Sequence, residues 1–271
     1  MKKVLALLTL CSILQLNALE LNIDIGTGMS YAKSSGKPIF TKDLWSNSSS
    51  DFNHNSAPGI YTWINIESNE KYWPKAYFEF RQLKTEGHSY INLETDSTTI
   101  NSAKNFVENI IGKKISDIEL DSRLTQTSME GYLYYEYFEE SDFITLQAGL
   151  GMKKFDVDYV VTLMEGVQLN SNGGDTIPLV MLNSTYLLHK KDNGSSVVCE
   201  LGGKMYIFGD SDVYDYLGKV TFMTRYSDDT NIGLEIGYKK IYIDIKGSDI
   251  DTIAGYMSSS GVYIGLTAHF K

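Results

Sequence analysis

Apolar residues alternate with small or polar residues over most of this chain, and the last ten residues, VYIGLTAHFK, show the pattern clearly. Alternation with a period of two predicts β-strands that have one apolar face and one face of different character. The pattern recurs in LNIDIGTGMSY (21–31), FITLQAGLGMK (143–153), VVCELGGKMYI (197–207) and NIGLEIGYK (231–239). No segment has the character of a transmembrane helix. The sequence therefore predicts an all-β fold.

Two features of these strands favour a closed barrel in lipid over a soluble sandwich. Their second face is rich in glycine, which relieves crowding where side chains converge inside a narrow barrel. They run for roughly 10 to 18 residues, whereas strands of globular sheets usually have 5 or 6. In lipid every backbone group must be paired and no sheet edge can stay open. We therefore expect a closed antiparallel transmembrane β-barrel whose apolar side chains face lipid.

Ten strands are predicted, an even number as in single-chain bacterial barrels, and counts from eight to twelve stay open. The predicted strands are 19–32, 58–68, 75–86, 118–137, 143–160, 175–190, 195–209, 213–227, 230–246 and 260–271. Short connections alternate with long ones, as periplasmic turns alternate with external loops. The predicted external loops are 33–57, 87–117, 161–174 and 247–259, with the short GDSD (209–212) as the exception. A hairpin within 87–117 would raise the count to twelve.

Residues 1–18, MKKVLALLTLCSILQLNA, have the pattern of a secretory signal peptide: two lysines, an apolar run and a small residue, Ala18, at a cleavage position. Its removal would leave 19–271 as a single outer-membrane β-barrel domain. Only Cys199 follows the signal, so no intramolecular disulfide is expected. The expected location is the outer membrane of a Gram-negative bacterium, after secretion to the periplasm.

The charge of the chain limits its partners. With 24 basic and 34 acidic residues the formal net charge is −10, and no basic patch appears, which argues against nucleic-acid binding. We expect the barrel to be a monomer. Its expected partners are outer-membrane lipid and lipopolysaccharide. The outer-membrane assembly machinery is a further partner, because the last strand resembles its recognition signal. That signal is carried by Val262, Ile264, Leu266, Ala268 and Phe270.

Charged side chains recur on the faces predicted to point into the barrel. They are Glu79, Arg81, Glu130, Glu136, Glu200, Lys204, Asp215, Lys219, Arg225, Glu235 and Lys239. Opposite charges on neighbouring strands would pair across the lumen. A salt-bridged core that closes the barrel is one interpretation, and it suits a ten-stranded barrel, which is close in size to filled eight-stranded ones. A porin-like channel for ions or small solutes is the alternative.

Aromatic residues gather near the predicted periplasmic turns, as they do at membrane interfaces. They are Trp73, Tyr132, Tyr134, Tyr135, Tyr137, Phe138, Phe222 and Tyr226. We expect these rings to contribute to an interfacial belt.

Catalytic chemistry has little support in the sequence. The four histidines are His54, His88, His189 and His269, and none has a partner at metal-ligand spacing. A lipid hydrolase or acyltransferase would need His54 or His88, both in predicted external loops, to meet a serine and a carboxylate in space. We predict that the chain is not an enzyme and has no catalytic, cofactor-binding or metal site, with a lipid-modifying enzyme as the third interpretation.

From Tyr132 onward the chain resembles a family of small, largely uncharacterised proteobacterial outer-membrane β-barrel proteins. The residues that carry the resemblance are LYYEYF (133–138), TIPLVM (176–181), GDSDVYDYLGKV (209–220), LEIGYKKIYID (234–244) and the closing VYIGLTAHF. In the first half, GIYTWINIE (59–67) and WPKAYFEF (73–80) are similar to the family's second and third strands. The resemblance implies an outer-membrane barrel and brings no catalytic residues. With the charge pattern, it leads us to expect a structural or surface-interaction role.

Overall fold

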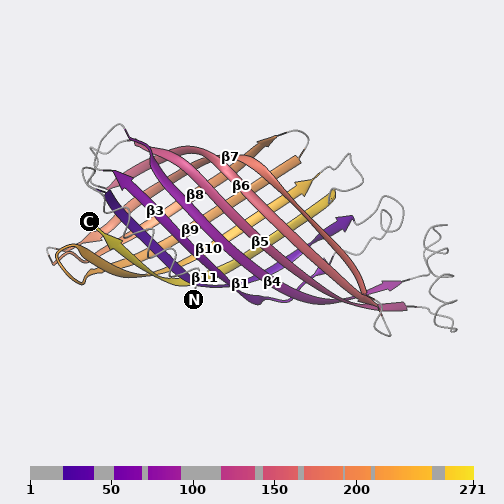
Figure 1. The fold of residues 1–271 in the computed structure, drawn as a ribbon. Helices are drawn as coiled ribbons and strands as arrows, with labels where there is room; N and C mark the ends of the chain where they lie inside the picture. Colours follow the sequence, from indigo (N-terminus) through magenta and orange to yellow (C-terminus); the bar gives the residue numbers. More distant parts are fainter. Residues whose placement is uncertain are drawn as a thin grey trace, which may run out of the picture.

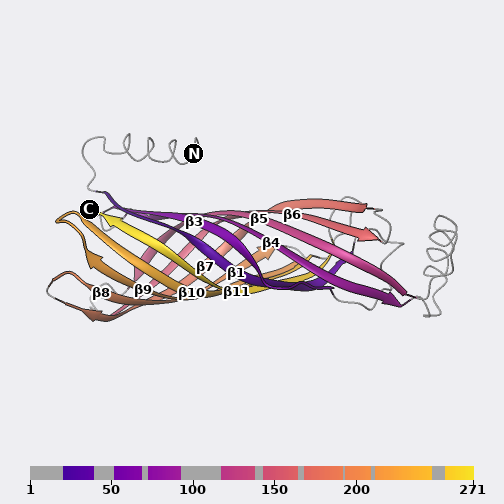
Figure 2. The same cartoon turned by 90° about the horizontal axis from the view of Figure 1, so that it is seen from below.

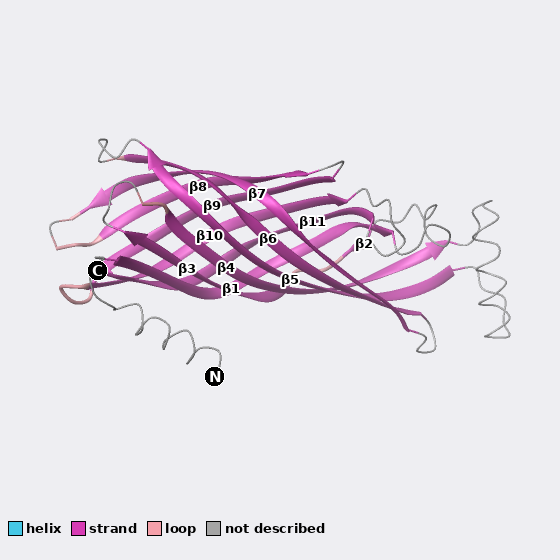
Figure 3. Ribbon diagram, turned by 45° about the horizontal axis from the view of Figure 1, so that its top comes forward, coloured by secondary structure: helices cyan, strands magenta, loops and turns pink. Residues whose placement is uncertain are grey.

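The structure is a computed structural model in which strands form nearly all of the described chain (Figure 3). It describes residues 21–39, 52–68, 73–92, 117–137, 143–163, 168–191, 193–208, 211–245 and 254–271. The predicted signal peptide, 1–18, lies outside these ranges, as does most of the 87–117 segment in which a further hairpin was considered. Within the described ranges, no helix is long and apolar enough to cross a membrane.

The strands form one closed antiparallel barrel (Figure 1). Its elements are β1 (Leu21–Ile39), β2 (Phe52–Asn53), β3 (Ala57–Ser68), β4 (Lys75–Asn92), β5 (Asp117–Tyr137), β6 (Ile144–Leu163), β7 (Gln168–Lys190), β8 (Ser196–Phe208), β9 (Ser211–Arg225), β10 (Thr230–Ile245) and β11 (Ala254–Phe270). The barrel closes where β11 pairs with β1, from Ile23↔Phe270 to Ile39↔Ala254. In the described part of the chain ten strands are long, and β2 is a two-residue addition to β1. The predicted fold class and the count of ten strands are confirmed.

The two ends of the barrel differ in their connections. One end, here called the turn end, carries the short connections 69–74, 138–143, 191–195 and 226–229. The other, the loop end, carries the connections that follow β1, β4, β6, β8 and β10. Viewed from below, the strands cross the barrel obliquely from one end to the other (Figure 2).

Apolar side chains cover the outside of the barrel, as the alternation predicts. On β11, Ile264 is 51% exposed and Leu266 is 67% exposed, whereas Tyr263 between β1 and β10 is 4% exposed. Leu150 of β6 and Leu182 of β7 are equally open. An apolar outer band of this kind suits lipid and would be costly in water.

Several strands run further toward the loop end than the sequence indicated. β4 and β5 pair as far as Asn92↔Asp117, and β6 and β7 as far as Thr162↔Gln168. β5, β6 and β7 have 21, 20 and 23 residues. A tilted strand needs about 9–11 residues to span a bilayer, so roughly half of each of these strands extends beyond one. Residues expected in external loops therefore continue the sheet.

Residues 52–56 complete the wall where β3 ends. β3 begins at Ala57, opposite Ala32, while β1 continues toward the loop end. In the space left between β1 and β4, the His54 amide donates to Ser34 O and the Asn55 amide to Glu86 O, both at 2.8 Å. This segment places the His54 side chain inside the barrel, 4% exposed.

The interior contains apolar and aromatic groups as well as charges, which the sequence analysis did not anticipate. A cluster of buried side chains consists of Tyr132, Tyr134, Leu179, Met181, Tyr206, Val213, Ile241 and Ile243. Tyr132 and Tyr134 are 6% and 3% exposed, so their assignment to an interfacial belt is wrong. Tyr135 and Tyr137 alternate with them and point outward, at 45% and 53% exposed.

Candidate functional site

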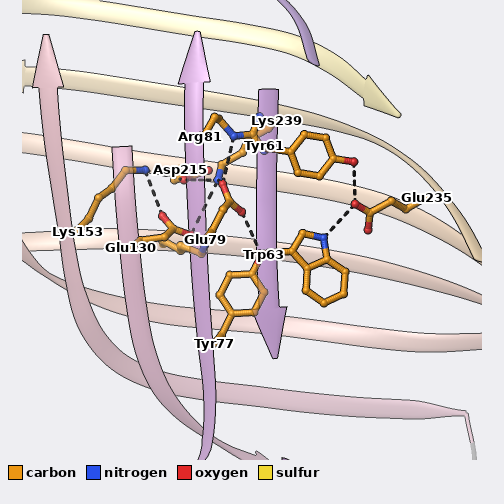
Figure 4. A network of polar contacts seen from close by, with 11 residues as sticks. Tyr61, Trp63, Tyr77, Glu79, Arg81, Glu130, Lys153, Asp215, Glu235 and Lys239 are labelled. Carbon is orange, nitrogen blue, oxygen red and sulfur yellow. Dashed lines mark hydrogen bonds and ion pairs between the residues drawn. The ribbon is translucent and has the colours of Figure 1, made fainter. Parts of the chain in front are cut away.

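The candidate site is a network of ion pairs that crosses the barrel interior (Figure 4). Strand alternation turns one residue in two inward, and the antiparallel pairing brings inward residues of neighbouring strands side by side. Glu79 on β4 thus pairs in register with Glu130 on β5, which pairs with Lys153 on β6. Lys204 on β8 pairs in register with Asp215 on β9.

Three carboxylates form the centre of the network, and each lies between two or more cations. Lys153 Nζ lies 3.2 Å from both Glu130 Oε2 and Asp215 Oδ2. Lys239 Nζ lies 2.7 Å from Glu79 Oε1 and 3.2 Å from Asp215 Oδ2. These five side chains are nearly inaccessible, which makes every interaction among them stronger than it would be in water.

Two further cations complete this central group. Lys204 bonds to Glu130. Arg81 Nε donates to Glu79 Oε1 at 3.1 Å. Together the central group holds three carboxylates and four cations.

A second group of charges adjoins the first around Glu235, which is fully buried on β10. The Tyr61 hydroxyl donates to Glu235 Oε1 at 2.7 Å, and Trp63 Nε1 donates to the same oxygen at 3.0 Å. Lys219 Nζ lies 2.8 Å from Glu200 Oε2 and 3.9 Å from Glu235 Oε2. This group holds two carboxylates and one cation.

Taken together, the two groups are electrically neutral. The five acids are Glu79, Glu130, Glu200, Asp215 and Glu235. The five bases are Arg81, Lys153, Lys204, Lys219 and Lys239. Removing a single member would leave one buried charge of the network uncompensated, which is far costlier than leaving the network intact.

Aromatic rings surround the cations of the network. Lys204 Nζ lies 4.9 Å from the ring centre of Tyr132, and Lys219 Nζ lies 5.1 Å from that of Trp63. The Arg81 guanidinium lies 5.3 Å and 5.5 Å from the ring centres of Tyr61 and Tyr263. A cation is attracted to the face of such a ring, so the rings hold the cations and fill the space around them.

The structure brings nine of the eleven predicted lumen charges into this network. Glu136 lies nearer the turn end, where it bonds to Lys75, which also lies 3.1 Å from Glu67. Arg225 does not join either group, because its side chain is 48% exposed at the end of β9 and pairs with Asp228 in the adjacent turn. In the alternation along β9 it occupies an inward position, but the barrel wall ends there.

Sequence reasoning missed Lys153, although a signal for it was present. On β6 this lysine has the same parity as Gln147, Gly149 and Gly151, and the residue before it, Met152, faces outward at 55% exposed. The donors Tyr61 and Trp63 were also missed, because only charged residues were followed along the inward faces.

A hydrolase would need one histidine that contacts both a serine and a carboxylate, and the side-chain hydrogen bonds of His54 and His88 each supply one of these two. His54 has its two ring nitrogens 2.8 Å from Thr85 Oγ1 and Ser122 Oγ, deep inside the loop end. His88 bonds to Asp121 on the exposed outer face of β4 and β5. His269 Nδ1 lies 2.6 Å from Asp24 Oδ1. Among the described residues, no group of three or more His, Cys, Asp or Glu side chains could hold a metal ion.

The last strand places its five signal residues on one face. Val262, Ile264 and Leu266 are more than half exposed, and Phe270 is 39% exposed next to the turn end. Their side chains point away from the network and toward the surroundings of the barrel. The role of this face in assembly stays a prediction.

The fold defines a class, the closed antiparallel β-barrel of the outer-membrane type, and the chain is similar to solved structures that include an outer membrane protease. The outer membrane protease OmpT from Escherichia coli has a TM-score of 0.53 at 7% sequence identity, over 94% of this chain and 98% of that chain. The translocator domain of the autotransporter NalP from Neisseria meningitidis has a TM-score of 0.41 at 9% identity, over 97% and 94%. Ail, the attachment invasion locus protein of Yersinia pestis, has a TM-score of 0.30 at 8% identity, over 92% and 99%.

These likenesses concern the fold. No protein-family model and no curated protein sequence matches the chain. The resemblance to outer-membrane β-barrels is therefore supported at the level of the fold, whereas the narrower resemblance to one uncharacterised family has no matching family model behind it.

The comparison with OmpT corrects the prediction that the chain is not an enzyme. OmpT is a protease and its fold is similar to the present one over almost the whole of both chains. The same architecture hosts different functions in different proteins, so a small closed barrel gives no ground for excluding catalysis. That prediction is withdrawn.

Proposed function

We propose that this protein is an integral outer-membrane barrel whose lumen is closed by the ion-pair network, and that its role, structural or in surface interactions, is exercised at the loop end. The observation that carries the proposal is the neutral set of five acids and five bases that bridges β4, β5, β6, β8, β9 and β10. A conducting pore needs charges that stay hydrated, whereas these charges are buried against one another and against aromatic rings.

The outer surface supports the proposed location. The apolar band on β6 ends at Met152, and the next outward residue, Lys154, pairs with Asp156 at 3.4 Å with both side chains about half exposed. On β4 and β5, Glu86 and Arg123 form an exposed pair at 2.8 Å. Charged pairs on an outward face belong in water, so they mark where the band for lipid and lipopolysaccharide ends.

The loop end supports the proposed role. Beyond these charged pairs β4, β5 and β6 continue as paired strands by six to nine residues, which corresponds to about 15–20 Å for tilted strands. A rigid sheet with an exposed polar face is suited to contact with other molecules outside the membrane. We propose that secretion uses the signal at 1–18, that the assembly machinery reads the closing strand, and that the barrel is a monomer.

Single-channel conductance in a planar bilayer tests the closed lumen. The refolded wild-type protein should be silent. The double variant Glu130→Ala with Lys204→Ala removes an acid and a base together, and should conduct because it opens the centre of the network without leaving a net charge.

The matched control is Glu86→Ala with Arg123→Ala, which removes an ion pair from the exposed outer face of β4 and β5. This variant should be as silent as wild type. Steady conductance by the wild-type protein would overturn the proposal in favour of the small-solute channel.

A further inference from the structure

A small cavity lies inside the barrel on the loop-end side of the ion-pair network. Its volume is about 20 Å³, and its lining includes Ser30, Arg81, Gln126, Ser128 and Lys239. Arg81 follows Glu79 toward the loop end of β4, and Ser128 and Gln126 precede Glu130 on β5. The cavity thus adjoins the network on one side and the hydroxyl-rich loop end on the other.

Two buried polar atoms at this cavity have no hydrogen-bond partner in the described part of the chain. They are Ser30 Oγ and Gln126 Nε2, on side chains that are 3% and 4% exposed. Ser259 Oγ donates to Gln126 Oε1 at 3.2 Å, which orients the amide and leaves its NH₂ group for the cavity. A buried donor without an acceptor is costly, so the arrangement calls for an occupant.

Arg81 supplies further donors. Its hydrogen bond among the described residues is that of Nε to Glu79. A guanidinium has five N–H donors, so the four on its Nη atoms are left for other acceptors. The two tyrosine rings beside Arg81 attract its charge but accept no strong hydrogen bond. At the cavity, Arg81, Lys239 and the NH₂ group of Gln126 can only donate hydrogen bonds, and the hydroxyl of Ser30 can donate one as well.

The charge of the side chains next to the cavity is positive, which suits an occupant that accepts hydrogen bonds. The central group next to the cavity holds Glu79, Glu130 and Asp215 against Arg81, Lys153, Lys204 and Lys239. One positive charge is therefore in excess there. The compensating negative charge belongs to the other group, around Glu235.

From these observations we propose that the cavity is a binding site for a small monovalent anion, of which chloride is the physiological example. The anion accepts hydrogen bonds from Ser30, Gln126 and Arg81 and lies beside the central group, in which cations outnumber carboxylates. A cation is repelled by Arg81 and Lys239. With a volume of about 20 Å³, the cavity suits one small occupant.

Bromide is the probe, because it replaces chloride and scatters anomalously. The protein is refolded and crystallised in sodium bromide without chloride, and data are collected at the bromine absorption edge. We expect an anomalous peak within hydrogen-bond distance of Ser30 Oγ and Gln126 Nε2. Thermal unfolding in detergent should show a midpoint that rises with sodium chloride and saturates, compared with sodium gluconate at equal ionic strength.

The variant Gln126→Glu places a carboxylate in the cavity with little change of shape, and should abolish both the anomalous peak and the chloride-dependent midpoint. The control Gln82→Glu makes the same change on the neighbouring strand, where Gln82 bonds to Thr127 outside the cavity, and should keep both. If Gln126→Glu does not fold, Ser30→Ala should weaken the peak. Absence of the peak in wild type, or its persistence in Gln126→Glu, overturns the proposal.

Discussion

Glu79 of β4 and Glu130 of β5 are register partners, so two buried carboxylates lie side by side on the inner wall. Like charges directly opposite one another on adjacent strands are destabilising. Lys239 offsets this, because its Nζ atom lies 2.7 Å from Glu79 Oε1 and 4.0 Å from Glu130 Oε1. The acids of one wall are thus held by lysines from the opposite wall, and the network ties the barrel together across its lumen.

Adjacent lysines on β6 provide a direct test of the network's contribution to stability. Lys153→Met removes a buried cation shared by Glu130 and Asp215 and should lower the free energy of unfolding by about 3–5 kcal/mol, since it leaves the buried network with one uncompensated negative charge. Lys154→Met removes an exposed pair with Asp156 and should lower it by less than about 1 kcal/mol. Urea unfolding in lipid vesicles, followed by tryptophan fluorescence, measures both. Equal losses for the two variants would contradict a stabilising role for the network.

Two glycines make room for the hydroxyl that holds Glu235. Gly28 and Gly265 are register partners, and a Cβ atom on either would come within 2.6 Å and 2.1 Å of Tyr61 Oη. Gly265→Ala should displace Tyr61 from Glu235 and lower the free energy of unfolding by about 1–3 kcal/mol, as overpacking of a filled core does.

The control for this prediction is Gly203→Ala. A Cβ atom there would meet its nearest neighbour at 4.0 Å, so the free energy of unfolding should be unchanged. The same urea titration serves for both glycines. If Gly265→Ala proved as stable as Gly203→Ala, the interior would be looser than the structure indicates.

The segment that carries His54 should loosen in acid. Burial lowers the pKa of His54 from 6.5 to about 4, although the nearby Glu86 carboxylate raises it. Between pH 4 and 6.5, His54 is therefore protonated when the segment is undocked and neutral when it is docked. Docking is therefore fully stable above pH 6.5 and loses stability as the pH falls toward 4, by about 3 kcal/mol at 1.36 kcal/mol for each pKa unit.

Hydrogen exchange of the Asn55 amide, which donates to Glu86 O, reports this docking. After correction for the intrinsic effect of pH, its protection should decrease below pH 6.5 in wild type. In His54→Asn, which has no titrating ring, protection should not change between pH 6.5 and 4. A flat profile in wild type would show that His54 is not protonated on undocking.

The strand pattern was predictable from the sequence because the period of two is local information. It located strands such as 75–86 and 230–246 and identified the inward face of each. Parity alone also assigns Lys153 to the interior, so its omission was a failure to apply the rule to every residue. The extension of β4 to Asn92 was not predictable, since the residues from Gly87 to Asn92 lack clear alternation and depend on pairing with β5.

The composition of the site was only partly predictable, because it depends on the stagger between strands. Sequence shows that Glu79 and Lys239 both face inward, but not that they meet across 160 positions of the chain. Which aromatic residues enter the lumen depends instead on the alternation along each strand. Tyr132 and Tyr134 were expected at the membrane interface because aromatic type was weighed before parity.

The cancellation of charge inside the lumen also decides where the protein's electric field originates. The chain carries a formal net charge of −10, and the five acids and five bases of the network contribute nothing to it. The excess of acidic residues therefore lies elsewhere, on parts of the chain outside the network. Such a field extends about one Debye length into the solution, about 10 Å at 0.1 M salt, and draws cationic molecules while slowing the approach of anionic ones. Because the network has no net charge, it adds little to the field that a molecule in solution meets, and charge selection depends on the surface residues.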